Sequence, residues 1–353
     1  MKRAKNLYPQ IISFENLLLA SRKACKSKRD KPAVHDFHLN LEKNLISIQA
    51  ELKDKVYKPG PYRSFIVFEQ KKRVISAAPY KDRVVHHALC NVIEPLFDRR
   101  FISDSYACRK GKGQHKAIAR ARSFISRYNF VLKLDVQRYF PSVDHEILKY
   151  RIRKVIGDRD AIWLIDQIID SYSESIPLVQ YFPGDDLFSP LEMRKGMPIG
   201  NLTSQIFANI YLDGLDHFIK EKLRLKAYCR YVDDLVIFGN NKMELHRFKN
   251  DILAFLDDLR LRIHPKKCLI SLTRDGVEFL GYRIFPHFMK VRKNTVKHFK
   301  KKLSAYQRDY SYDKVPATKI SKVVESWLAH LAHGNNYKLA RDLLSEFKFC
   351  KVI

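Results

Sequence analysis

The chain has 353 residues, 46% of them hydrophobic, so it can bury a large core and form several subdomains. Lysine and arginine number 66 against 38 aspartate and glutamate residues, and the resulting formal net charge of +28 favours nucleic acid as a partner, because so basic a chain needs a polyanion to neutralise it. No apolar run approaches the roughly 20 residues that span a bilayer, so we do not expect a membrane protein.

Two features of the chain indicate the cytoplasm. Pro9, Glu15 and Asn16 interrupt the apolar residues near the N-terminus, so this segment does not have the pattern of a secretory signal peptide. The six cysteines are scattered without C-x-x-C spacing, which is typical of reduced thiols and not of a disulfide framework or a zinc site. We therefore expect a cytoplasmic protein.

The first part of the chain is predicted to form a helix, a hairpin and a second helix. Apolar residues between 37 and 56 recur at intervals of three and four, which is the spacing of an amphipathic helix. The breaker Lys58-Pro59-Gly60-Pro61 ends that helix. Residues 65–68 and 73–76 are rich in β-branched and aromatic side chains and predict two strands, and a helix is expected from near Asp82.

The middle of the chain alternates between helices and strands. A basic loop with two glycines at 109–113 precedes a hydrophobic strand at 130–136. Asp144 is placed to cap the helix that follows. A long irregular stretch at 171–195 leads through a glycine-containing turn to a helix whose apolar face spans 207–219.

Acidic residues stand at the ends of two predicted strands. Residues 230–238 hold two strand-like runs around Asp233 and Asp234, which predicts a hairpin with carboxylates at its turn. The upstream strand carries Asp135 at its end. Carboxylates crowded together are costly unless cations neutralise them. Magnesium prefers oxygen ligands, so these acids are candidate ligands for it.

Two other acidic pairs lack this setting. Asp185-Asp186 follows a Pro-Gly turn without apolar runs on both sides. Asp257-Asp258 lies in a segment with helical spacing, where neighbouring side chains point about 100° apart and do not converge on one metal. We expect both pairs to be solvated surface acids.

The order of elements indicates how the acidic strands are arranged. The succession strand, helix, helix, strand, strand, helix, strand fits a split β-α-β sheet with the acids at one edge. The chain after residue 281 is predicted to be helical and basic, with a core stripe that includes Trp327. A solvated helix face is one interpretation of its lysines, and a nucleic-acid contact is the one we favour for Lys293, Lys297, Lys300 and Lys301.

These motifs together resemble those of reverse transcriptases. The resemblance rests on Tyr231-Val232-Asp233-Asp234, on Asp135 upstream, and on Gly200-x-x-x-Ser204 between them. It covers roughly residues 60 to 285. Within that range, further conserved blocks of the family are resembled by residues 78–83, 105–111, 261–270 and 279–281.

The resemblance implies an α+β fold in the form of a right-hand polymerase. Its parts are fingers, a ferredoxin-like palm built on the split β-α-β sheet, and a helical thumb. The expected boundaries are an N-terminal helical extension at 1–60, fingers at 61–134, a palm at 135–285 with an insertion at about 157–200, and a basic helical thumb at 286–353.

The resemblance also implies an RNA-directed DNA polymerase, a nucleotidyltransferase that uses two Mg²⁺ ions and dNTPs to copy template RNA into an RNA/cDNA duplex. Asp135 and Asp233 are expected to be the principal metal ligands. Asp234 is expected to be a further ligand or an electrostatic neighbour, and the backbone carbonyl of Val136 an extra ligand. Phe140, five residues after Asp135, resembles the steric gate that meets a ribose 2′-hydroxyl, with an ordinary core aromatic as the alternative.

Basic residues are expected to hold the substrates. Arg83, and with it Lys72 and Arg73, resembles the residues that grip the triphosphate, although each is also placed to contact the template backbone. Lys267 is expected to support the nucleotide or the geometry of the palm. Contacts with the nucleic acid are expected at Arg109, Lys110, Lys112, Lys293, Lys297, Lys300 and Lys301.

One run separates subgroups of the family. Group II intron and retroviral enzymes have Gln before the glycine and Pro after the serine, whereas Ile199-Gly200 and Ser204-Gln205 resemble the reverse transcriptases of diversity-generating retroelements. Those enzymes copy a template-repeat RNA with errors at adenines for mutagenic retrohoming, and they imply a small basic helical accessory protein oligomer as a partner. Ile199 and Gly200 would border the incoming nucleotide, where an apolar side chain cannot supply the hydrogen bonds of an amide.

Other functions remain open at this point. The chain fits a reverse transcriptase of another bacterial class, either an antiphage-defence enzyme or a group II-like one. A catalytically inactive RNA-binding scaffold would not need the three acids and Phe140 that the chain retains. A two-metal nuclease would use an acidic cluster, but it would need neither Phe140 nor the run around Gly200.

Overall fold

The computed structural model describes residues 2–68, 72–174 and 179–351. Over these ranges the protein combines helices with three small antiparallel sheets, so the expected mixture of α and β structure is confirmed. No helix in this part of the chain is long and apolar enough to cross a bilayer. Of the insertion expected at 157–200, residues 175–178 lie outside the described ranges.

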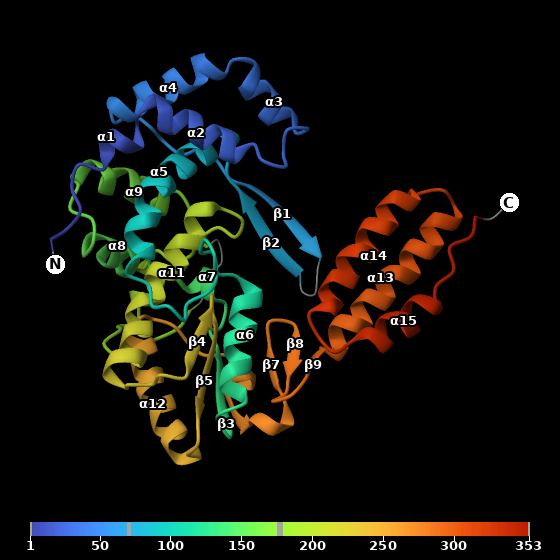
Figure 1. Ribbon diagram of the computed structural model, residues 1–353. Helices are drawn as coiled ribbons and strands as arrows, with labels where there is room; N and C mark the ends of the chain where they lie inside the picture. Colours follow the sequence, from blue (N-terminus) through green and yellow to red (C-terminus); the bar gives the residue numbers. More distant parts are fainter. Residues whose placement is uncertain (1, 69–71, 175–178, 352–353) are drawn as a thin grey trace.

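The N-terminal helices form one end of the molecule (Figure 1). They are α1 (Tyr8–Ile11), α2 (Phe14–Ala24), α3 (Pro32–Leu39), α4 (Leu41–Lys53) and the longer α5 (Tyr80–Asp98). The prediction of a single helix over 37–56 is wrong, because Asn40 leaves the helical region at φ −119° and ψ 43° and separates α3 from α4. Val56 lies beyond the end of α4 and is 61% exposed, so it does not extend the apolar face.

A two-stranded hairpin follows α4 and extends toward the side of the molecule where the C-terminal helices stand (Figure 1). Its strands are β1 (Arg63–Phe68) and β2 (Lys72–Ala77), which pair antiparallel from Arg63 opposite Ala77 to Phe68 opposite Lys72. Both predicted strands are therefore confirmed. Phe65 and Phe68 are exposed on this hairpin.

The central sheet contains β3 (Phe130–Asp135), β4 (Tyr228–Tyr231), β5 (Asp234–Gly239) and β6 (Leu269–Leu272) in the order β4-β5-β3-β6. Every neighbouring pair is antiparallel, so β5 runs between the two mutually parallel strands β3 and β4. The expected boundary between residues 134 and 135 falls inside β3.

Helices cover both faces of the central sheet. Leu132 and Leu134 of β3 pack into the same core cluster as Ile252 of α12 (Lys242–Asp258), whereas Val131 packs into a second cluster with Phe124 of α6 (Gln114–Ile125). Successive strand residues point to opposite faces, so burial of both faces explains why the strands are almost continuously apolar.

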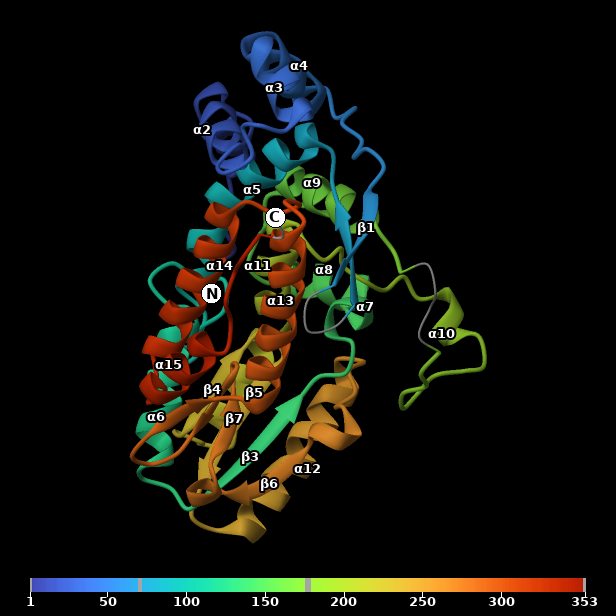
Figure 2. The same cartoon turned by 90° about the vertical axis from the view of Figure 1, so that its right-hand side faces the viewer.

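In its described residues, the connection between β3 and β4 holds five α-helices and a loop around α10. The helices are α7 (Tyr139–Ser142), α8 (His145–Arg153), α9 (Arg159–Asp170), α10 (Ser189–Glu192) and α11 (Leu202–His217), which ends in a π-helical turn at Phe218–Lys222. Asp144 caps α8 as predicted, by accepting hydrogen bonds from the backbone N–H groups of Glu146 and Ile147. The loop around α10 projects from the body of the molecule (Figure 2).

One acid in that loop is not solvated. The side chain of Asp185 is 4% exposed, and its carboxylate accepts hydrogen bonds from Arg260 Nη2 at 2.6 and 2.7 Å. The prediction of a solvated acid was wrong because Arg260 binds this carboxylate. Arg260 lies 75 residues away in the chain, so the sequence around Asp185 does not indicate the contact.

The C-terminal part consists of a small sheet and a helical bundle. The sheet is β7 (Val277–Phe279), β8 (Tyr282–Ile284) and β9 (Met289–Val291), and the bundle is α13 (Lys293–Ser311), α14 (Ala317–Ala332) and α15 (Tyr337–Ser345). Phe299 and Trp327 stack with their ring centroids 4.2 Å apart in the bundle core, which confirms the predicted stripe.

Candidate active site

Three carboxylates meet where the hairpin β4–β5 lies against the end of β3. Asp135 is the last residue of β3 and pairs directly with Asp234, the first residue of β5. Asp233 lies in the turn between β4 and β5, and its carbonyl accepts a hydrogen bond from the N–H of Val136 at 3.2 Å. The acids that the sequence singled out are thus neighbours in the structure.

Burial and the repulsion of neighbouring carboxylates raise the pKa of Asp233 and of Asp234. Burial raises the pKa of Asp233, and the charge of Asp135 raises it further. Burial also raises the pKa of Asp234 to about 6, with contributions from Asp233 and Asp135. Lys133 and Lys267 oppose this effect, because their Nζ atoms lie 3.4 Å from Asp234 Oδ1 and 2.6 Å from Asp135 Oδ2. The site therefore concentrates negative charge that only cations relieve.

The donor set fits a hard divalent cation. Carboxylate oxygens are the ligands that Mg²⁺ prefers. Asp234 Oδ1 is buried and accepts no hydrogen bond from the described residues. Across those residues no three His, Cys, Asp or Glu side chains already form a metal-binding group, and two of the acids are occupied by lysines. An ion entering this site would take over the charge compensation that the lysines now provide.

The run around Ile199 is fixed to two other segments by backbone hydrogen bonds. The N–H of Ser76, on β2, donates to the carbonyl of Ile199 at 3.1 Å. The N–H of Met197 donates to the carbonyl of Phe140 at 2.9 Å. Gly200 has φ +118°, and a Cβ there would lie 2.9 Å from Cγ2 of Ile75. Both Ile199 and Phe140 are half-buried, so each keeps a partly open face beside this junction.

The basic residues predicted to contact the nucleotide differ in their exposure and in their partners. Lys72 and Arg73 are exposed on β2, and the charge of Arg73 lowers the pKa of Asp233. Arg83 is half-buried on α5, and its Nε donates to the carbonyl of Ala78 at 2.9 Å. Lys267 does not lie free but pairs with Asp135. Of this set, Arg73 and Lys267 act electrostatically on the acidic site.

The basic glycine-containing loop is mostly tied to the protein itself. The side chain of Arg109 is 7% exposed and donates to Asp98 and to the carbonyls of Ile102 and Ser105. It therefore holds the loop together, and its expected contact with RNA stays a prediction. Lys112 donates to the carbonyl of Ser103, whereas Lys110 is exposed.

The four lysines of α13 that were expected to contact nucleic acid do not line the cavity beside this helix. Lys293, Lys297 and Lys301 are exposed, whereas Lys300 pairs with Glu346 at 2.6 Å. A cavity of about 680 Å³ lies between this bundle and the rest of the protein. Its walls include basic and polar residues that the sequence analysis did not select, namely Gln114, Arg292, Lys302 and Lys322. Only the tertiary fold brings these positions together.

Comparisons with known proteins identify a family whose members resemble this chain in sequence. A family model described as "Reverse transcriptase (RNA-dependent DNA polymerase)" matches residues 56–284, more than half of the chain. Protein YkfC of Escherichia coli K12 is 24% identical over 277 residues, which cover 67% of this chain and 70% of that protein.

Two further relatives have names that refer to introns. The putative COX1/OXI3 intron 1 protein of Saccharomyces cerevisiae is 23% identical over 255 residues, which cover 60% of this chain and 31% of that protein. The group II intron-encoded protein LtrA of Lactococcus lactis subsp. cremoris is 22% identical over 363 residues, which cover 81% of this chain and 58% of that protein. The chain thus spans less than two thirds of the length of both.

Proposed function

This chain belongs to the reverse transcriptase family, and from that premise we propose that it copies template RNA into cDNA at the carboxylate cluster of Asp135, Asp233 and Asp234. The expectation of an RNA-directed DNA polymerase is confirmed at the level of the family. The observation that carries the proposed site is the pairing of Asp135 with Asp234 beside the turn that holds Asp233. Two Mg²⁺ ions bound there would activate the primer 3′-hydroxyl and neutralise the triphosphate.

The arrangement of elements supports a right-hand assignment. In this proposal the hairpin β1–β2 and helix α5 belong to the fingers, the central sheet with α11 and α12 forms the palm, and α13–α15 form the thumb. The RNA/cDNA duplex would lie along the face of α13 on which Lys293, Lys297 and Lys301 are exposed. Lys110, which is exposed in the loop after α5, is a further candidate for contact with the nucleic acid.

The nucleotide would enter between β2 and the end of β3. We assign Lys72 and Arg73 to the triphosphate, because both are exposed on the strand that is bonded to Ile199. The Phe140 ring would bar a ribose 2′-hydroxyl, since its carbonyl is tied to the same segment. The Val136 carbonyl is an additional candidate ligand beside Asp135.

Primer extension on an RNA template tests this proposal. Asp233→Asn removes one carboxylate and leaves the basic surface unchanged, so DNA synthesis should be lost while RNA binding persists. Asp258→Asn is the matched control, because Asp258 is an exposed acid on α12. Synthesis by Asp233→Asn at the rate of the control would overturn the assignment.

We further propose that the enzyme is of the diversity-generating retroelement type and makes errors at template adenines. The support is Ile199 before Gly200 and Gln205 after Ser204, with Gln205 exposed in the first turn of α11. From the same resemblance, the proposal includes a small basic helical accessory protein oligomer that assists template binding. The second candidate is a group II-like intron enzyme, which the intron-encoded relatives favour.

The two candidates differ in what Ile199 does. Ile199→Gln supplies a polar group beside the nascent base pair, whereas Ile199→Leu keeps the side chain apolar. The loop stays anchored in both variants, because Ser76 bonds to the backbone of residue 199. Sequencing of cDNA should show fewer errors at template adenines for Ile199→Gln than for the wild type or Ile199→Leu. Equal adenine errors in all three would remove this support.

A further inference from the structure

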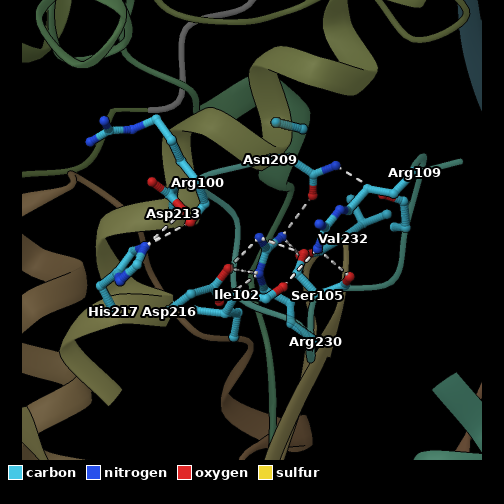
Figure 3. A network of polar contacts seen from close by, with 12 residues as sticks. Arg100, Ile102, Ser105, Arg109, Asn209, Asp213, Asp216, His217, Arg230 and Val232 are labelled. Carbon is cyan, nitrogen blue, oxygen red and sulfur yellow. Dashed lines mark hydrogen bonds and ion pairs between the residues drawn. The ribbon is translucent and has the colours of Figure 1, made fainter. Parts of the chain in front are cut away.

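Arg230 lies on β4, two residues before Val232 in the turn that holds Asp233, and is fully buried. Its side chain is 0% exposed, as is that of Asp216 on α11. Arg230 Nε and Nη2 donate to the two carboxylate oxygens of Asp216 at 2.8 and 2.6 Å, which is a bidentate pair. Nη1 donates to Asn209 Oδ1 at 3.1 Å, and Nη2 donates to Ser105 Oγ at 3.2 Å (Figure 3).

One further hydrogen bond of this guanidinium reaches the turn itself. Arg230 Nη1 donates to the carbonyl of Val232 at 3.0 Å. Val232 has φ +56°, a left-handed conformation that is unfavourable for a β-branched residue. Such conformations persist only where the surroundings enforce them. The next residue is Asp233, so the conformation of Val232 decides where that carboxylate lies.

Stability alone does not explain a buried ion pair. Two buried charges lose hydration that their attraction only partly returns, and apolar side chains of similar size are often as stabilising. What apolar side chains cannot do is hold a backbone carbonyl at a fixed angle. The Arg230 guanidinium is rigid and planar, and Asp216 fixes its orientation through both oxygens.

We propose that Arg230 is a positioning residue for the polymerase site: locked by Asp216, it holds the Val232 carbonyl and so keeps the strained turn that places Asp233 beside Asp135. This inference rests on the proposed function. The strand itself is anchored independently of the side chain, because the N–H of Arg230 donates to the carbonyl of Asp104 and its carbonyl accepts from Tyr106. Loss of the guanidinium should therefore disturb the turn and leave β4 in place.

The first test is Arg230→Lys. A lysine can still pair with Asp216, but it lacks the fork that also reaches Val232. We expect kcat for primer extension to fall roughly 10- to 100-fold, because small displacements of reacting groups have effects of this size. RNA binding should be unchanged, and the thermal stabilisation by Mg²⁺ without substrates should be smaller than in the wild type. Ser105→Ala is the matched control, since it removes one bond to the same guanidinium and spares the bond to Val232.

The second test is rescue by glycine. Val232→Gly adopts a positive φ without the steric penalty, so Arg230→Lys/Val232→Gly should regain at least several-fold in kcat over Arg230→Lys. A residue needed only for folding would not be bypassed by a change in the turn. If Arg230→Lys does not fold, Arg230→Met/Asp216→Asn takes its place, because it removes both charges and keeps an acceptor for the Tyr228 hydroxyl, now bonded to Asp216 at 2.6 Å.

The outcomes separate the inference from the proposed function. If the wild type does not extend a primer, the proposed function fails. If the wild type is active and kcat is unchanged in the Arg230 variant, the positioning role is refuted. A loss of kcat that Val232→Gly does not relieve also refutes it, because Arg230 would then act through the fold as a whole. Loss with rescue, and a normal Ser105→Ala, supports it.

Discussion

Replacing Gly200 with alanine should damage the junction between the hairpin β1–β2 and the Ile199 segment. At φ +118° an alanine is strained, with an expected cost of about 1–3 kcal/mol. Its Cβ would also lie 2.9 Å from Cγ2 of Ile75, an overpacking that costs a further 1–3 kcal/mol or so. We therefore expect Gly200→Ala to lower the free energy of unfolding by roughly 2–6 kcal/mol.

Gly184→Ala is the matched control for this prediction. Gly184 also has a positive φ, +89°, but a Cβ there would meet nothing within 4 Å. The control thus carries the backbone strain and the change in unfolded-chain entropy without the clash. Urea unfolding should show a smaller loss for Gly184→Ala, and only Gly200→Ala should raise KM for dNTPs, because β2 and Ile199 share a hydrogen bond.

A double-mutant cycle with Ile75→Ala isolates the clash. Removing Cγ2 of Ile75 leaves room for the new Cβ, so the double variant should be more stable than the sum of the two single changes predicts. Additive losses, or a Gly200→Ala variant no less stable than Gly184→Ala, would refute the close approach of Ile75 to Gly200 as the reason for glycine there.

Three further predictions concern sugar selection, RNA binding and pH. Phe140→Ala should raise the ratio of ribonucleotide to deoxyribonucleotide incorporation, and an unchanged ratio would make Phe140 an ordinary core residue. RNA affinity should fall steeply as salt rises, and Lys297→Ala should reduce the slope of log K against log salt by about one; a flat dependence in the wild type would exclude the exposed lysine face of α13 as the RNA track. Burial raises the pKa of Asp213 from 3.8 to about 6, so between these pH values the unfolded chain loses this proton before the folded protein does, and stability falls as pH rises from 3.8 to about 6 and stays low above it. Asp213→Asn should therefore stabilise the protein by about 1–3 kcal/mol at pH 8, reduced by the loss of the ion pair with His217. At pH 5 the stabilisation should be roughly half as large. Equal stabilisation at both pH values would contradict the raised pKa of Asp213.

The carboxylate cluster could be predicted from the sequence because the strands that carry it have recognisable local patterns. Asp135 ends the apolar strand β3, and Asp234 begins the apolar strand β5. The pairing of these two strands brings the two acids together. Burial of both sheet faces, by α6 and α12, accounts for the apolar runs that made the strands recognisable. Local pattern and tertiary structure agree at these positions.

What the sequence did not provide depends on contacts between distant segments. Nothing near Arg109 in the chain indicates that Asp98 and two carbonyls surround its guanidinium. The bond from Arg230 to Asp216 joins a strand to a helix, and an arginine in an apolar strand was its only local sign. Asn40 divides one predicted helix into two and is the N-cap of α4, a position that asparagine prefers, so this break had a local signal that the apolar spacing concealed.

The pairs Lys133–Asp234 and Lys267–Asp135 have a practical consequence. Because lysines already offset the acids, the protein's architecture does not depend on an inorganic ion to hold the cluster together. Treatment with EDTA should therefore abolish DNA synthesis without unfolding the protein. Added magnesium should restore synthesis without a delay for refolding. Such an enzyme can be stored idle on its RNA and started at a chosen moment, which makes the first nucleotide addition accessible to rapid-mixing experiments.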